Sequence, residues 1–134
     1  MSLLKMIIIT IYTVKKNEKG DNGMFIQLKT VIVKEGNAEQ MVERFSGEGL
    51  IEQQKGFIDL SVLKKKQRRG DEEVIIMIRW ESESDWKAWE TSDIHLAGHR
   101  EKRGKPSPSY IIESSQDVYH VLSTKEYREP SRIQ

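Results

Sequence analysis

Residues 73–104 read EVIIMIRWESESDWKAWETSDIHLAGHREKRG, and this stretch decides the fold. It starts with an apolar run at 74–78 that is bounded by charges and is too short for a typical helix, so it predicts a strand ending at Trp80. Ser82 then caps a helix, with an acidic residue three positions later as a weaker form of the usual capping box. Apolar residues recur at helical spacing on both sides of a break at 91–93. The stretch therefore predicts a strand, a helix, a short turn and a second helix.

The rest of the chain adds further strands and one more helix to this unit. Strands are predicted at 25–33, 57–66, 72–80 and 110–122, and a helix at 38–46. Asn37 is a good N-cap for that helix. The resulting order is β-α-β-β-α-β, the ferredoxin-like arrangement of the α+β class.

The loop at 64–71 is strongly basic, and Gly70 supplies the turn between two strands. No aromatic residues are interleaved with its lysines and arginines to stack nucleobases, so a solvated turn is the preferred interpretation. The whole chain carries 22 Lys and Arg against 21 Asp and Glu, and a net charge of +1 gives no global attraction to nucleic acid or to an acidic membrane. No nucleic-acid partner is therefore expected.

Length and composition favour one domain with a modest core. The chain has 134 residues, of which 37% are hydrophobic and 32% are charged. One domain is expected at this length, and a core of this size is often completed by dimerisation. The absence of cysteine excludes disulfides and thiolate metal sites, and it fits a reducing, cytoplasmic location.

An apolar run at 6–14 precedes the predicted domain. The run is too short to span a membrane and has no small-residue cleavage site after it, so no membrane association is expected. Its β-branched residues predict a strand that adds to a sheet edge, because an unpaired apolar strand is an association hazard. Residues 1–23 are therefore assigned as an extension, 24–123 as the domain and 124–134 as a polar tail.

The segment RWESESDWKAWETSDIHLAGH at 79–99 resembles the IsdG-type haem-degrading monooxygenases, which belong to the wider antibiotic-biosynthesis-monooxygenase group of small dimeric α+β barrels. In order and spacing, the matching residues are Trp80, Trp89, Ser92, Asp93, Ala97 and His99. Shorter blocks at 33–36, 43–45 and 55–57 also match, and the likeness covers residues 24–123. The chain is most similar to the Bacillus-type members. The resemblance implies a homodimer, which would also cover the open face of a four-stranded sheet.

Three histidines are candidates for metal ligation: His95, His99 and His120. A histidine met alone on a helix is more often structural than a ligand. His99 is favoured because it shares a face with Leu96, three residues earlier, which should turn its ring toward the apolar side. His95 should be turned away and exposed, and His120 is most simply a residue of a sheet face. The resemblance places His99 at the family's haem-ligating position, where one axial histidine leaves the opposite side of the iron open to dioxygen.

Trp89 and Lys29 complete the catalytic residues that the resemblance implies. From the residues alone, Trp89 is most simply a core side chain, whereas the equivalent tryptophan of the family presses on the porphyrin and helps to ruffle it. Lys29 stands where IsdG-type members carry an asparagine on the first strand, and an ammonium group cannot copy the donor and acceptor chemistry of an amide. Lys29 is therefore expected to contact a haem propionate or to polarise bound oxygen. This departure affects rate and regiochemistry more than haem binding.

Further residues are expected to line the haem pocket. Three cations follow His99 closely: Arg100, Lys102 and Arg103. They can pair with haem propionates, although a solvated helix C-terminus explains them equally well. Phe45 and Leu96 are candidates for the pocket wall, and core packing explains each of them equally well. Glu90 and Asp93 could orient a ring nitrogen of His99.

The resemblance implies an oxygenase in which haem is both substrate and cofactor. His99 would hold the iron, an external electron donor would reduce it, and O2 would be used to cleave the porphyrin so that iron is released. No carboxylate cluster, Ser-His-Asp constellation or phosphate-binding glycine loop offers a competing catalytic site. Two alternatives stay open: a cofactor-independent monooxygenase that acts on a quinol-like aromatic with His99 as general base, or a non-enzymatic haem-binding module.

Overall fold

A computed structural model describes residues 23–131 of the chain. Its centre is a four-stranded antiparallel sheet with the strand order β2-β3-β1-β4. The strands are β1 (Phe25–Val33), β2 (Phe57–Lys64), β3 (Glu72–Trp80) and β4 (Ile111–His120). The helices are α2 (Ala38–Ser46), the short 3-10 helix η1 (Ile51–Gln53), α3 (Glu83–Glu90) and α4 (Asp93–Lys102). The predicted β-α-β-β-α-β order and the ferredoxin-like α+β class are confirmed.

The predicted boundaries agree with the structure at β1, α2 and β3 and differ at the two edge strands. β4 covers Ile111–His120 instead of 110–122, because His120 lies opposite Phe25, the first residue of its partner strand β1. β2 ends at Lys64 instead of residue 66. The Lys64 side chain turns to a carboxylate on β3, and the residues that follow form an exposed basic loop, as expected for a solvated turn.

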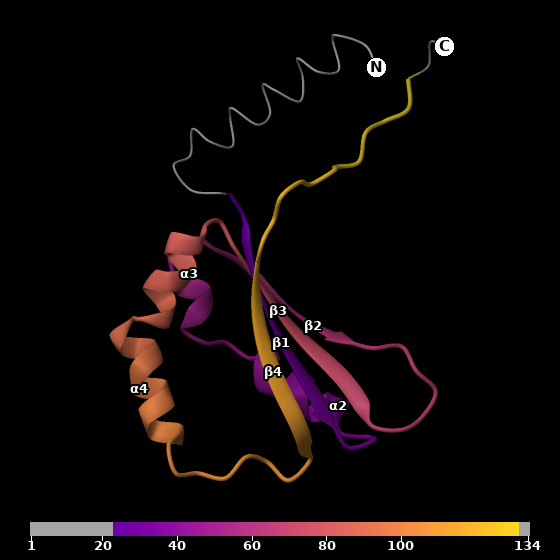
Figure 1. Cartoon of the computed structure of the whole chain (residues 1–134), viewed down its shortest axis with the longest axis vertical. Helices are drawn as coiled ribbons and strands as arrows, with labels where there is room; N and C mark the ends of the chain where they lie inside the picture. The colour runs from indigo at the N-terminus through magenta and orange to yellow at the C-terminus, as the bar shows by residue number, and fades with distance from the viewer. Residues whose placement is uncertain (1–22, 132–134) are drawn as a thin grey trace.

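The core lies between the helices and one face of the sheet (Figure 1). Buried residues alternate along β1 and β3, which is the pattern of a sheet with only one face covered. Trp80 is fully buried together with Phe25, Met41 and Ile76, so this tryptophan is a core residue. The Phe25 ring also meets Trp86 of α3, with 5.1 Å between the ring centroids. This contact fixes α3 against the end of the sheet.

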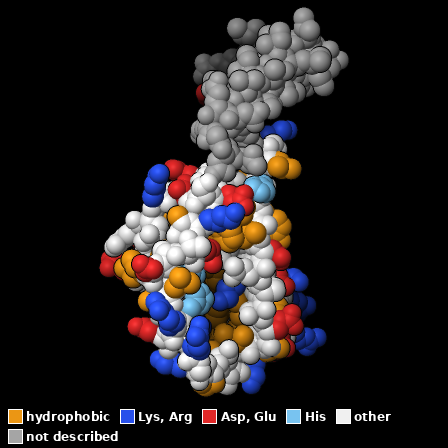
Figure 2. Space-filling model, turned by 60° about the vertical axis from the view of Figure 1, so that its left-hand side comes forward, with side chains coloured by type: hydrophobic (Ala, Val, Ile, Leu, Met, Phe, Trp, Pro, Cys, Tyr) orange, Lys and Arg blue, Asp and Glu red, His pale blue; other side chains and the backbone are white. Residues whose placement is uncertain are grey.

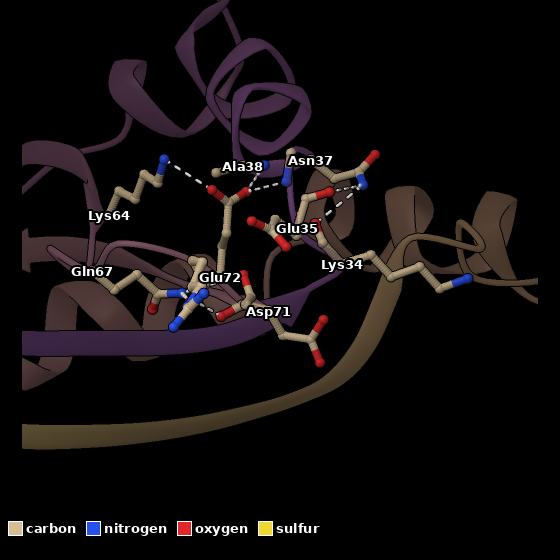
Figure 3. Close-up of polar contacts among 11 residues, drawn as sticks. Lys34, Glu35, Asn37, Ala38, Lys64, Gln67, Asp71 and Glu72 are labelled. Atoms are coloured by element: carbon tan, nitrogen blue, oxygen red, sulfur yellow. Dashed lines mark hydrogen bonds and ion pairs between the residues drawn. The ribbon is translucent and has the colours of Figure 1, made fainter.

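A distant carboxylate caps the N-terminus of α2, and the predicted cap by the Asn37 side chain is wrong. Asn37 holds the N-cap position, but its amide nitrogen donates to two preceding backbone carbonyls. Glu72 Oε1 instead accepts from the backbone N–H groups of Gly36 at 3.0 Å and Ala38 at 2.9 Å (Figure 3). Glu72 Oε2 pairs with Lys64 Nζ at 2.9 Å. The ammonium group of Lys64, and then the N–H of Ala38, lowers the pKa of Glu72.

The other face of the sheet is left uncovered within residues 23–131. Its apolar side chains are only half-buried: Ile26, Leu28, Ile32, Ile75 and Met77. Arg79 forms a bidentate contact with Asp59 on the same face, and this contact lowers the pKa of Asp59. The face therefore combines an apolar centre with an ion pair near one end.

The described segment that follows β4 lies outside the sheet. The strand predicted at 6–14 falls outside the described residues. Residues 121–131, which follow β4, contain no helix or strand. Among the helices of residues 23–131, none has both the length and the apolar character that crossing a membrane requires.

Candidate functional site

A hollow lies between α4 and the sheet, on the face that the helices cover. α4 packs against α3 but stands away from the strands (Figure 1), and its Ile94 and Leu96 side chains are 48% and 45% exposed. Val118 of β4 is 40% exposed, although it lies opposite the buried Gln27 and so belongs to the covered face. Figure 2 shows the hollow with histidine and basic side chains beside it and hydrophobic side chains inside it. The space between α4 and the sheet is thus partly apolar and open to solvent.

The two histidines of α4 contact each other at the edge of this hollow. The Nε2 atoms of His95 and His99 are 2.9 Å apart, and their ring centroids are 4.4 Å apart. The His95 ring also lies against Trp89 of α3, with 4.8 Å between centroids. Its side chain is only 18% exposed, and its Nε2 atom is 3.5 Å from Glu90 Oε2.

This arrangement corrects two expectations about the imidazoles. His95 was expected to be turned away and exposed, but it is the more buried of the pair, and His99 is exposed. Glu90 was expected to orient His99, but it contacts His95. Residues three and four apart on a helix share a face, so Leu96 and His95 are both neighbours of His99, and the position of Trp89 decides which ring is covered.

The environment of His95 favours its neutral form. Burial is the main cause that lowers the pKa of His95, and the nearby His99 and Lys102 add to it, against an opposing effect from Glu90. A neutral imidazole keeps a lone pair for a hydrogen bond or a metal. One of the two histidines can therefore donate an N–H and the other can accept it.

Lys29 lies on the helix-covered face of β1, between α2 and α4. Its Nζ atom is 6.0 Å from the centre of the Phe45 ring on α2, and the Arg44 guanidinium lies 5.7 Å from the same ring. Burial, followed by repulsion from Arg44 and Lys102, lowers the pKa of Lys29. Within the described residues, Lys29 forms no ion pair with a carboxylate. The hollow thus contains a half-buried cation beside two more cations, which is an environment suited to an anion.

Gln27 is a polar side chain that the sequence reasoning did not select. It is 7% exposed, and its Oε1 atom has no hydrogen-bond partner among residues 23–131. It precedes Lys29 by two positions on the same strand, so both side chains belong to the same face. Alternation along β1 already grouped Gln27 with Phe25 and Val31, and a polar residue in that apolar row was the signal that could have found it.

The remaining predicted pocket residues are distributed around the hollow. Phe45 is half-buried against the core, whereas Leu96 stays largely exposed. Arg100 and Arg103 are exposed, and the backbone N–H of Arg103 closes the C-terminus of α4 by donating to the Arg100 carbonyl at 3.2 Å. Lys102 is the cation of this group whose charge acts on both Lys29 and His95.

A second cavity of about 700 Å³ lies between α2, η1 and β2. Its walls combine the apolar side chains of Phe45, Ile51 and Phe57 with the charged Arg44 and Asp59. It contains no imidazole, and none of the catalytic residues suggested by the sequence lines it. The hollow beside α4 is therefore the candidate site.

Comparison with known families explains this arrangement. The family model described as antibiotic biosynthesis monooxygenase matches residues 24–101, which is more than half of the chain. The chain belongs to the antibiotic biosynthesis monooxygenase family. The family and the fold that the sequence suggested are thus confirmed.

Curated relatives of this antibiotic biosynthesis monooxygenase support the same assignment. The heme-degrading monooxygenase HmoA of Bacillus subtilis (strain 168) is 56% identical over 103 residues, covering 77% of this chain and 95% of the relative. The heme oxygenase (staphylobilin-producing) of Staphylococcus haemolyticus is 35% identical over 102 residues, covering 75% of this chain and 98% of the relative. The chain is therefore an enzyme of the monooxygenase type, related to the IsdG-type proteins.

Solved structures share the fold of this antibiotic biosynthesis monooxygenase. A crystal structure of a Bacillus cereus protein described as a candidate antibiotic biosynthesis monooxygenase has a TM-score of 0.71 at 57% identity, covering 80% of this chain and 99% of that chain. MhuD from Mycobacterium tuberculosis, solved with two hemes bound in its active site, has a TM-score of 0.56 at 17% identity and 76% coverage of this chain. At that identity, the likeness to MhuD shows a common fold alone.

Proposed function

We propose that the chain is a haem-degrading monooxygenase that binds haem in the hollow between α4 and the sheet and releases its iron. The observation that carries the proposal is the exposed imidazole of His99 beside a partly apolar hollow, together with the Lys29 ammonium group, which has no ion pair among residues 23–131. Haem has the same mixed character, because its ring is apolar and its propionates are anionic. The 56% identity to a heme-degrading monooxygenase supports the assignment of the substrate.

His99 is the proposed axial ligand. Its ring is exposed, and its Nε2 atom lies 2.9 Å from the Nε2 atom of His95. A neutral imidazole is a suitable ligand for haem iron. Ligation through Nε2 requires the hydrogen bond between His99 and His95 to open, so His95 must then rely on Trp89 and Glu90 for its position. Haem supplies the redox chemistry when it is bound, with O2 as oxidant and electrons from an external donor.

Trp89, Leu96 and Phe45 are the proposed apolar walls. Trp89 is half-buried and is held in place by the His95 ring at 4.8 Å, so it presents a fixed surface beside the iron ligand. Leu96 is 45% exposed in the free chain and would lose that exposure against a flat macrocycle. The role of these walls is to hold the ring in one orientation and to exclude water from it.

Lys29 and Gln27 are the proposed polar contacts inside the hollow. Lys29 has two cationic neighbours and no anionic partner in the described residues. A haem propionate would offset the repulsion among these positive charges by forming an ion pair with the Lys29 ammonium group. Arg100, Lys102 and Arg103 extend the same positive potential to the solvent side. Gln27 offers a buried acceptor and an amide donor on the strand where IsdG-type members carry an asparagine.

We also propose that the enzyme works as a homodimer. The uncovered sheet face exposes apolar residues of β1 and β3, and a second copy is a suitable cover because the family is built of dimeric barrels. Residues 24–123 would form the catalytic domain, in agreement with the family match over 24–101.

Haemin binding followed by turnover tests the proposed activity. The full-length chain is mixed with haemin and the Soret band is recorded; ascorbate is then added in air with catalase present. Binding should shift the Soret band, and turnover should bleach it. A shift without bleaching would leave only the haem-binding module as an explanation. The absence of a shift would rule out both the haem-degrading enzyme and the haem-binding module. A quinol-like substrate consumed without haemin would instead favour the cofactor-independent alternative.

Replacing the proposed iron ligand tests the site. His99→Ala should weaken haemin binding by about 10–100-fold, the loss typical of a removed metal contact. His120→Ala is the matched control, because His120 lies on β4 against Phe25, with ring centroids 5.0 Å apart, and away from α4. Equal haemin binding by both variants would show that another residue holds the iron, while the haem-degrading function could still stand.

A further inference from the structure

We propose that His95 and His99 together form a chelating site for a divalent transition-metal ion such as Cu²⁺ or Ni²⁺, and that such an ion excludes haem from His99. The second half of this statement rests on the proposed function, and the first half does not. The two histidines are four residues apart on α4, which places both rings on one side of the helix. Their Nε2 atoms converge to 2.9 Å.

The separation of the two nitrogens fits one metal ion. With metal–nitrogen bonds of about 2.0–2.1 Å, two donors 2.9 Å apart subtend an angle of about 90° at the metal. This is the angle between neighbouring ligands in square-planar and octahedral complexes, the geometries of Cu²⁺ and Ni²⁺. A tetrahedral Zn²⁺ ion would need the nitrogens a few tenths of an ångström further apart, which small rotations of the exposed His99 side chain can provide.

The charges around the pair are of both signs, because the Glu90 carboxylate lies beside His95 and the positive charge of Lys102 also acts on that ring. Glu90 Oε2 lies 3.5 Å from His95 Nε2 and contributes a negative charge beside the site. No group of three or more histidine, cysteine or acidic residues in the described part of the chain is arranged to hold a metal. The proposed site therefore has two protein nitrogens, and water would complete its coordination.

The same contact allows a simpler role, in which the two rings only hydrogen-bond to each other. The two interpretations differ in what the exposed His99 ring can do. A hydrogen bond alone predicts no metal affinity beyond that of an isolated surface histidine. A chelate predicts that either imidazole alone binds much more weakly than the pair, because the second donor binds intramolecularly.

Metal binding without haem tests the first half of the proposal. The full-length chain is titrated with CuCl2 and, separately, with NiCl2 by calorimetry, and the stoichiometry should be one ion per chain. His95→Ala and His99→Ala should each reduce the affinity by at least about tenfold, while His120→Ala retains it. His99→Gln gives a second variant at the exposed position, and circular dichroism verifies that each variant is folded. Equal affinity of the wild-type chain and of the variants at positions 95 and 99, or no binding by the wild-type chain, would overturn the site.

Competition with haemin tests the second half. Ni²⁺ is suitable because it is not reduced under these conditions, and it should decrease the Soret shift of the wild-type chain in proportion to site occupancy. In His95→Ala, which lacks one chelating nitrogen, haemin binding should become at least about tenfold less sensitive to Ni²⁺. Metal binding with no effect on haemin would overturn the mutual exclusion and leave the metal site standing. A chain that binds metal but never haemin would contradict the proposed function instead.

Discussion

Lys29 places an ammonium group on the helix-covered face of a strand that is otherwise mostly apolar. Its burial and the repulsion from Arg44 and Lys102 both disfavour the charged form, so its pKa is lowered. Keeping a charge in such a position costs folding free energy unless a partner compensates for it. Perturbed groups of this kind concentrate at functional sites. The cost is explained if an anionic ligand, such as a haem propionate, supplies the missing partner.

Lys29→Met should therefore raise the stability of the free chain and weaken its binding of haemin. The variant keeps the length of the side chain without its charge, and the free chain should become more stable by about 1 kcal/mol or less, discounted because the group is partly exposed. Its affinity for haemin should fall by about tenfold, the value of one charge-assisted contact. Urea denaturation and Soret titration measure the two effects. Lys87→Met, which removes an exposed lysine of α3, is the control and should change neither property.

The stability gain of Lys29→Met should also depend on pH. Because the pKa of Lys29 in the folded chain is below its ordinary value of 10.5, the unfolded chain binds more protons in the window between the two values. The stability of the wild-type chain therefore rises with pH across that window. The difference between variant and wild type should shrink as pH approaches 10.5. A constant difference would contradict the assigned cause.

The histidines show what sequence spacing can and cannot decide at this scale. The sequence was sufficient to select α4 and its histidines as candidate ligands. It could not decide which ring is buried, because Leu96 and His95 are both within one helical turn of His99. The covering group is Trp89 from α3, a tertiary contact that no spacing along α4 contains. Alternation along β1 marks Gln27 as a polar residue on the covered face, but only the structure shows that its Oε1 atom has no hydrogen-bond partner within residues 23–131.

Helix starts were predictable where the cap is local. Ser82 Oγ accepts from the backbone N–H of Asp85 at 3.1 Å, and Ser92 Oγ accepts from that of His95 at 3.2 Å. Both caps lie within three residues of their partners, so the sequence shows them directly. The start of α2 was predicted at the right residue for the wrong reason. Its capping carboxylate, Glu72, is 34 residues away from Ala38 and belongs to a strand.

Glu72→Gln should destabilise the chain through α2. The substitution keeps an Oε1 atom that can accept from Gly36 and Ala38, but it removes the negative charge that strengthens those bonds and pairs with Lys64. The melting temperature at neutral pH should fall by up to about 5 °C, the shift expected for a weakened helix cap in a domain of this size. Glu35→Gln, an exposed residue of the same turn, is the matched control and should leave it unchanged.

The pH dependence of the Glu72 effect follows from its lowered pKa. The stabilisation is fully present above the ordinary glutamate value of 4.5 and is lost as pH falls through the lower value of the folded chain. The melting curves of wild type and Glu72→Gln should therefore converge in acid. Curves that stay apart at low pH would show that the substitution acts by some effect other than charge.

At the scale of the whole molecule, the fold was predictable from the order of the elements, and the two central strands β1 and β3 bury alternate residues as their sequences suggest. Placement of α4 was not predictable in this way. Its apolar residues are too few to seal it against the sheet, and Ile94 and Leu96 stay exposed in the free chain. The hollow exists because this helix is attached mainly through α3 and not through a continuous apolar stripe.

The uncovered sheet face should be the surface through which two copies associate. Leu28 is central on this face, opposite Met77 on β3, and both side chains are only half-buried in one chain. Leu28→Asp would place a carboxylate in an apolar interface, so the dissociation constant of the dimer should rise by at least about 100-fold. Sedimentation velocity over a range of concentrations measures it, with Leu50→Asp, an exposed residue beside η1, as the control. A wild-type chain that stays monomeric at high concentration would rule out this interface.

Because the hollow is bounded by α4, β1 and β4 of one chain, a monomeric Leu28→Asp variant that still shifts the Soret band would show that haem binding does not need the second copy.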